Sequence, residues 1–161
     1  MSGTSTAATA STAAIARPSA APAATGSVRR RIATGLTVLI ALGIGYVGVS
    51  YLFAPESTAS GFGLPEWPRG EAAEFLSTKG IRDLASGIAP LVLLVTGRRR
   101  ALGWLLLVDA LIPLNDAVTV LTHHGSTATA FGVHGAAAAV VAVTAALLLT
   151  ERRPAPHALT A

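Results

Sequence analysis

Hydrophobic positions along the chain fall into four long runs separated by shorter polar segments. The runs cover about residues 32–53, 74–96, 101–122 and 127–149. At about 1.5 Å rise per residue, a helix of each length crosses a hydrocarbon core about 30 Å thick. The second and third connections are tight turns, which force antiparallel neighbours. The pattern therefore predicts an all-α protein, an up-down four-helix bundle integral to a membrane.

The residues before the first run predict a disordered tail. Residues 1–28 are mainly Ala, Ser, Thr, Gly and Pro, with no periodic apolar pattern. We expect a cytoplasmic tail over 1–31, a transmembrane domain over 32–150 and a short cytoplasmic tail over 151–161. The first run is longer than the apolar core of a secretory signal, and this favours a membrane helix that is retained.

Basic residues cluster on alternate sides of the four runs. Arg29–Arg31 precede the first run, Arg98–Arg100 separate the second from the third, and Arg152 and Arg153 follow the fourth. The other two connections are acidic or uncharged overall. Short cytoplasmic loops are rich in Lys and Arg, so four crossings place both termini in the cytoplasm. Eleven Arg to one Lys, with abundant Ala, is typical of a GC-rich bacterial genome, and we expect a multi-pass protein of the cell membrane.

Composition favours the same class. Mean hydropathy is +0.59 and 12% of the residues are charged, about half the share in soluble domains. The sequence pI is about 10.7, but the basic residues lie at membrane boundaries and not on one face with interleaved aromatics, so the expected partner is the lipid bilayer and no nucleic acid. The chain has no Cys, which excludes thiolate metal sites and cysteine nucleophiles.

Six ionisable residues fall inside the predicted crossings. A charge facing lipid there costs about 2.5–3.5 kcal/mol, so these side chains are expected to face the interior and to pair. Arg82 and Asp116 are the most natural pair, because guanidinium and carboxylate bond in a two-pronged fork. Pro113 is expected to kink the third helix near them. The candidate polar cavity, in the outer half of the bundle, comprises Lys79, Arg82, Asp83, Asp109, Asp116 and His134.

Small and aromatic residues suggest how the helices pack. Ala41, Gly45 and Gly48, and the Ala-rich fourth run, offer surfaces for close approach, either within the chain or along a homodimer seam. Tyr51 and Phe53 fall where an aromatic belt at the outer membrane surface is expected.

Three interpretations of the polar residues stay open. In the first, the cavity binds a small amphipathic or anionic molecule such as a quinone or lipid headgroup. In the second, the charges only fix helix packing in a structural or accessory subunit, which acts alone, as a homo-oligomer or with a larger membrane partner. In the third, Asp109 and Asp116 relay protons in a carrier. The sequence shows no phosphate loop, nucleophile elbow, zinc pattern or di-iron motif, so no catalytic residue, metal site or resident cofactor is predicted. Haem ligation would rest on His134 alone.

Several short motifs resemble a family of small four-helix membrane proteins known only as a domain of unknown function. They are Lys79-Gly80-Ile81-Arg82-Asp83-Leu84, Gly97-Arg98-Arg99, Leu102-Gly103-Trp104, Ile112-Pro113, Asp116 and His134-Gly135. The likeness covers about residues 32–150 and implies a four-crossing bundle without an assigned reaction. More distantly the chain resembles DoxX-type bundle proteins, which would imply association with redox or quinone chemistry.

Overall fold

The computed structural model describes residues 23–151, and in these the regular structure is entirely helical, which confirms the all-α prediction. The first helix, α1 (Ala23–Phe53), begins well before the predicted start at Ile32. Residues 23–31 are therefore helical and do not belong to the predicted disordered tail. The rest of that tail, and the C-terminal one from Arg152 onward, lie outside the described residues.

Within residues 23–151, eight further helical elements follow α1. Two short helices, α2 (Pro55–Ser60) and α3 (Glu71–Glu74), lie in the first connection and lead into α4 (Leu76–Val95). The third predicted run forms α5 (Arg99–Asp109) and α6 (Leu111–Thr122), interrupted at Ala110. The fourth forms α7 (Thr127–Thr129), the π-helix η1 (Ala130–Gly135) and α8 (Ala136–Leu149).

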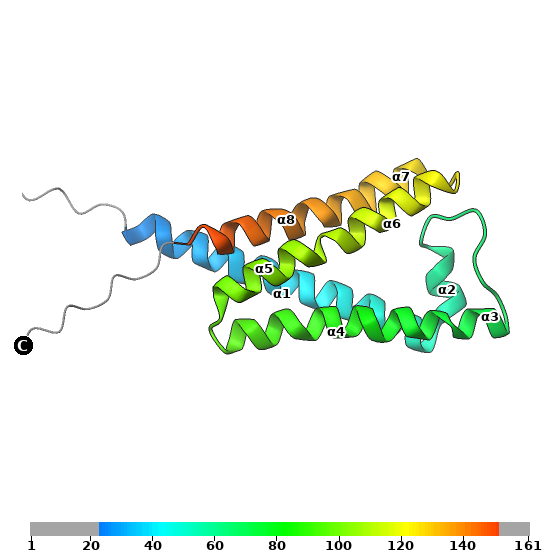
Figure 1. The fold of residues 1–161 in the computed structure, drawn as a ribbon, viewed down its shortest axis with the longest axis horizontal. Helices are drawn as coiled ribbons and strands as arrows, with labels where there is room; N and C mark the ends of the chain where they lie inside the picture. The colour runs from blue at the N-terminus through cyan, green and yellow to red at the C-terminus, as the bar shows by residue number, and fades with distance from the viewer. Residues whose placement is uncertain (1–22, 152–161) are drawn as a thin grey trace, which may run out of the picture.

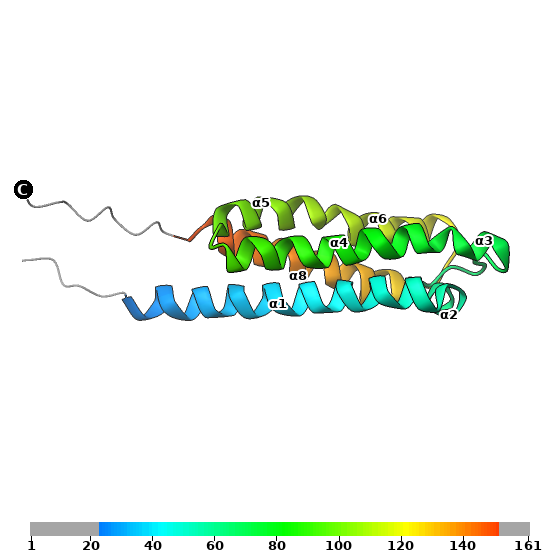
Figure 2. The same cartoon turned by 90° about the horizontal axis from the view of Figure 1, so that it is seen from below.

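The long helices pack as two pairs. One pair is α1 with α4, and the other is the α5–α6 segment with the η1–α8 segment (Figures 1 and 2). The pairs join through α1 against α8 and α4 against α5, at the end of the molecule where the described chain starts and finishes. The connection containing α2 and α3 lies at the opposite end, so the two pairs are held together most closely far from that connection.

Glycines bring α1 and α4 into backbone contact. A Cβ atom added to Gly48 would lie 2.5 Å from the Leu84 nitrogen, and one added to Gly87 would lie 2.7 Å from the Ala41 carbonyl oxygen. Gly80 meets the Gly48 carbonyl oxygen at 2.9 Å in the same way. No side chain fits at such distances, so the small surface of α1 is used within the chain, which favours the intramolecular alternative over a homodimer seam.

The apolar core lies between the second pair and α1. Leu102 and Leu106 on α5 are fully buried against Ala145 and Leu148 on α8, and Ala33 of α1 completes the cluster. Gly103 allows this approach, because a Cβ there would lie 2.8 Å from the Leu149 side chain. This core fixes the end of the molecule at which the two pairs meet.

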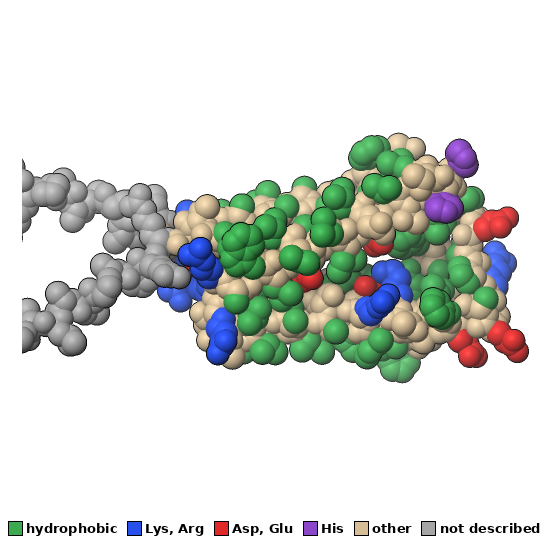
Figure 3. All heavy atoms as spheres, in the orientation of Figure 1, with side chains coloured by type: hydrophobic (Ala, Val, Ile, Leu, Met, Phe, Trp, Pro, Cys, Tyr) green, Lys and Arg blue, Asp and Glu red, His purple; other side chains and the backbone are tan. Residues whose placement is uncertain are grey.

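In the part of the chain that the structure describes, three helical stretches are long and apolar enough to cross a membrane: Gly26–Phe53, Arg99–Thr122 and Thr127–Leu149. The predicted second crossing, α4, is not among them, because Lys79, Arg82 and Asp83 fall within its 20 residues. Figure 3 shows hydrophobic side chains spread over the outside of the long helices, as a lipid-facing surface requires. Exposed examples are Leu42, Val108, Leu111 and Phe131.

Arginines from two segments meet the end of α8. The Arg99 guanidinium forms two bonds of 2.6 Å with the Glu151 carboxylate and a third of 3.0 Å with the Thr34 hydroxyl. Arg29 donates to the Leu147 carbonyl oxygen at 2.8 Å and to the Thr150 hydroxyl. The basic clusters at 29–31 and 98–100 therefore lie at one end of the molecule.

Candidate functional site

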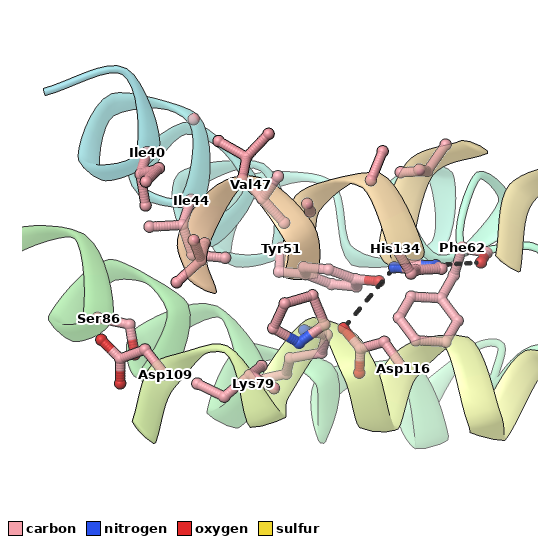
Figure 4. Close-up of a pocket in the computed structure, with 18 of the residues that line it drawn as sticks. Ile40, Ile44, Val47, Tyr51, Phe62, Lys79, Ser86, Asp109, Asp116 and His134 are labelled. Atoms are coloured by element: carbon pink, nitrogen blue, oxygen red, sulfur yellow. Dashed lines mark hydrogen bonds and ion pairs between the residues drawn. The ribbon is translucent and has the colours of Figure 1, made fainter. Parts of the chain in front are cut away.

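A cavity of about 530 Å³ lies between the two helix pairs, where they diverge toward the α2 end. Most of its lining is apolar and comes from one face of α1, from α6, and from η1 and α8. Figure 4 shows Ile40, Ile44 and Val47 following one another along α1, with Tyr51 at the end of this row. Polar side chains are few. Most gather at one end, here called the polar end, and Ser86 and Asp109 lie apart from them on α4 and α5, so the apolar length of the cavity follows α1.

His134 lies at the polar end and is held from both sides. Its Nε2 atom is 2.9 Å from the Phe62 carbonyl oxygen, and its Nδ1 atom is 3.9 Å from the Asp116 carboxylate (Figure 4). The Phe62 ring also packs against the imidazole, with ring centroids 4.7 Å apart. The sequence predicts His134 and Asp116 in one cavity, and the structure brings these two residues together.

The bond to Phe62 fixes the protonation pattern of the imidazole. A carbonyl oxygen only accepts, so Nε2 carries the proton and donates it. In neutral His134 the Nδ1 atom is then an acceptor directed toward Asp116, and in the cationic form the two groups make an ion pair. The two residues therefore place a ring nitrogen and a carboxylate side by side at the polar end of the cavity.

The π-helix η1 explains how His134 reaches this position. The Ala136 N–H bonds the Phe131 carbonyl oxygen, five residues earlier, which widens the helix by one residue at His134. Such bulges shift the side chains that follow relative to an α-helix and are frequent at functional sites. Hydrophobic periodicity carries no signal for this irregularity.

Lys79 reaches the same end of the cavity from α4. Its ammonium lies 2.8 Å from Asp83, one turn further along, and 5.2 Å and 5.8 Å from the Tyr51 and Phe62 ring centres. Asp83 is 3% exposed, so this bond neutralises a buried carboxylate. Lys79 lines the cavity, whereas Asp83 is not among the lining residues.

Arg82 does not take the predicted place. Its side chain is exposed, and in the part of the chain that the structure describes it makes no ion pair with Asp116. The predicted Arg82–Asp116 pair is wrong, because α4 packs on α1 through Gly80 and Gly87, which directs Asp83 inward and leaves Arg82 outside. Asp116 has His134 as its partner.

Asp109 lines the cavity away from this polar end, near Ser86 (Figure 4). It is the last residue of α5, directly before the interruption at Ala110. Pro113 lacks the N–H that would bond the Asp109 carbonyl oxygen, which accounts for a break one turn before it. The predicted distortion near Pro113 is therefore present as a helix interruption that Asp109 borders.

Two aromatic residues at the site were not predicted to be there. Tyr51 is 3% exposed and lines the cavity, so it does not belong to an outer aromatic belt, whereas Phe53 is 85% exposed. Phe62 comes from the connection after α2. Tyr51 lies two turns of helix beyond Ile44 on one face of α1, a spacing that could have suggested the cavity, but no local pattern indicates that a loop residue folds over His134.

The model of a domain of unknown function, DUF4267, matches residues 41–148. No match was found among curated proteins or among solved structures. The family match covers more than half of the chain, and the protein belongs to this family, which confirms the closer resemblance in its sequence. The likeness to DoxX-type proteins stays a prediction.

Proposed function

We propose that this member of the DUF4267 family is a multi-pass protein of the bacterial cell membrane with four crossings and both termini in the cytoplasm. Three apolar helical stretches of spanning length support membrane insertion. The helix α4 would be the remaining crossing, second in chain order, and its packing along α1 through glycine contacts supports this. The ion pair between Lys79 and Asp83 lowers the cost of placing both charges in a membrane. The arginines gathered at one end support the orientation.

Within this arrangement the cavity binds a small amphipathic molecule, a quinone or a lipid. The observation that carries this proposal is the division of one cavity of about 530 Å³ into an apolar length along α1 and a polar end at Lys79, Asp116 and His134. Pockets for small molecules typically combine a mostly apolar lining with a few placed polar groups. The ligand's apolar part would lie along Ile40, Ile44 and Val47.

The polar end suits hydrogen bonding better than metal ligation. Both ring nitrogens of His134 are directed at protein groups, the Phe62 carbonyl oxygen and the Asp116 carboxylate. Lys79 supplies an ammonium donor, and Tyr51 points its hydroxyl toward His134 (Figure 4). A ligand carrying carbonyl or hydroxyl oxygens fits this set, and haem ligation through His134 is not part of the proposal.

Native mass spectrometry of the detergent-extracted protein tests ligand binding. We expect the parent to carry a lipid-like or quinone mass, and His134→Ala to lose most of it while extracting as the same oligomer. His123→Ala is the matched control, because His123 is exposed at the turn between α6 and α7. Ala137→Leu, which narrows the cavity and leaves Phe62 and Asp116 unchanged in sequence, should also reduce occupancy.

Two outcomes would overturn this function. Parent protein free of ligand but bound to a stable larger membrane partner would make it an accessory subunit. Equal ligand retention by the parent, His134→Ala and Ala137→Leu would place any bound molecule outside the cavity.

A further inference from the structure

The cavity is covered at the α2 end by a segment of the first connection. Phe62 and Gly63, here called the outer clasp, lie across the ends of α6 and η1. The Phe62 carbonyl oxygen accepts from His134, and the Gly63 carbonyl oxygen accepts from the Ser126 N–H at 2.8 Å. Two backbone carbonyls of adjacent residues are thus tied to the second helix pair.

Glycines make this closure possible. Gly63 has φ +101°, a conformation that side chains rarely adopt, and it packs against the Thr129 side chain. A Cβ on Gly125 would lie 2.3 Å from the Gly63 carbonyl oxygen. The outer clasp therefore fits closely against the turn between α6 and α7, and it separates the polar end of the cavity from the space beyond α2.

The side walls of the cavity are partly exposed, unlike the end that the outer clasp covers. Lining residues Leu39, Val133 and Val140 are 64%, 57% and 40% exposed, so the wall they form is also outer surface. They lie on α1, η1 and α8, where α1 packs against α8 but makes little or no contact with η1. The cavity is thus open between α1 and η1 through an apolar mouth.

The same cavity is also hollowed between α4 and α6, where its lining includes Lys79 of α4 and Asp109 and Asp116 of the α5–α6 segment. Figure 3 shows Lys or Arg side chains and Asp or Glu side chains around it. Charged groups favour a polar headgroup or water there over an apolar chain. The mouth formed by Leu39, Val133 and Val140 is the one suited to an apolar chain.

We infer that the cavity takes its ligand from within the bilayer, sideways between α1 and η1, and that the ligand is therefore a membrane-dissolved amphiphile and not a solute delivered from water. This rests on the proposed function, and it narrows the ligand class. An apolar chain that passes from lipid into this mouth exchanges one apolar environment for another, whereas a hydrophilic solute would lose its hydration against the same apolar side chains.

Fluorescence quenching from the two phases tests the route. Ile44, which lines the cavity, is replaced by Trp in a chain whose own Trp67 and Trp104 are changed to Phe. The protein is reconstituted in phosphatidylcholine vesicles with brominated acyl chains, and acrylamide is added to the water in a parallel sample. Chains that keep only Trp104, 54% exposed on α5, or only Trp67 in the first connection, serve as lipid and water references.

We expect brominated chains to quench the Ile44→Trp reporter about as strongly as Trp104, and acrylamide to quench it several-fold less than Trp67. Val140→Phe, at the mouth, should reduce quenching by the brominated lipid. Val143→Phe is the matched control, because Val143 is exposed on the same helix but does not line the cavity. Val47→Trp is the alternative reporter if Ile44→Trp does not fold.

Quenching of the reporter by acrylamide at the strength seen for Trp67 would show access from water and overturn the inference. A reporter protected from both quenchers would show a sealed cavity. Unchanged quenching by brominated lipid in Val140→Phe would place the entrance elsewhere. Either result also overturns the inferred entry route. A sealed cavity that still retains a ligand in native mass spectrometry would contradict the proposed entry route but not the proposed binding function.

Discussion

Lys79 and Asp83 form a 2.8 Å ion pair within α4, and the aspartate of this pair is 3% exposed. The lysine is the more accessible partner, with 28% of its side chain exposed, and it also borders the cavity. One residue thus neutralises a buried charge and lines the candidate binding site. The neighbouring Arg82, which carries the same charge, does neither.

Removal of Lys79 should therefore be costly. In Lys79→Ala the Asp83 carboxylate stays buried without its partner, and we expect a loss of about 3–5 kcal/mol in the free energy of unfolding. Thermal unfolding in a mild detergent, followed by circular dichroism, measures the change. The double variant Lys79→Met with Asp83→Leu should recover much of the loss, because no buried charge remains. Arg82→Ala is the control and should unfold close to the parent.

Close contact between α1 and α4 gives a second prediction. In Gly48→Ala the new methyl group would lie 2.5 Å from a backbone nitrogen of α4, so the helices must separate. We expect a loss of about 1–3 kcal/mol, measured by the same unfolding experiment. Gly35→Ala meets nothing within 4 Å and improves helix propensity, so it should unfold at or above the parent temperature. Equal effects of the two changes would show that the helices do not touch at Gly48.

The ion pair between Arg99 and Glu151 gives a third prediction. Both side chains are largely buried, 14% and 19% exposed, and the two bonds are charge-assisted. Arg99→Ala should cost about 2 kcal/mol of stability. Exchange of the two residues, Arg99→Glu with Glu151→Arg, should restore part of it, whereas additive damage in the exchanged protein would show that the pair does not form.

Topology is tested by cysteine labelling, since the chain has no Cys of its own. A single Ser60→Cys, at the end of α2, should react with a membrane-impermeant thiol reagent in intact cells. A single Ser11→Cys should react only after the cells are opened, because the N-terminus is proposed to be cytoplasmic. Labelling of Ser11→Cys in intact cells would contradict the four-crossing arrangement.

Helical character and the meeting of His134 with Asp116 follow from simple regularities of the sequence. Apolar runs of spanning length specify helices, and polar residues at similar depth on adjacent helices tend to meet. Both rules depend only on distance along a helix. They need no knowledge of which face a helix presents to its neighbour.

Rotation of α4 about its axis could not be obtained in this way. Arg82 and Asp83 are adjacent, about 100° apart around the helix, and the sequence favoured an inward Arg82 because Arg–Asp pairing is strong. Backbone contact at Gly80 and Gly87 decides the rotation instead. The outer clasp and the π-helix were missed for a related reason, because each depends on tertiary contacts with residues far along the chain.

Arg29 joins the beginning of α1 to the end of α8 by hydrogen bonds. Its described partners, the Leu147 carbonyl oxygen and the Thr150 hydroxyl, lie more than a hundred residues later in the chain. During synthesis α1 is made before these partners, so the guanidinium must find other partners, such as water, until α8 has been made. The N-terminal end of α1 is thus bonded by the last helix of the described chain, and a chain that stops before Leu147 lacks both of these bonds.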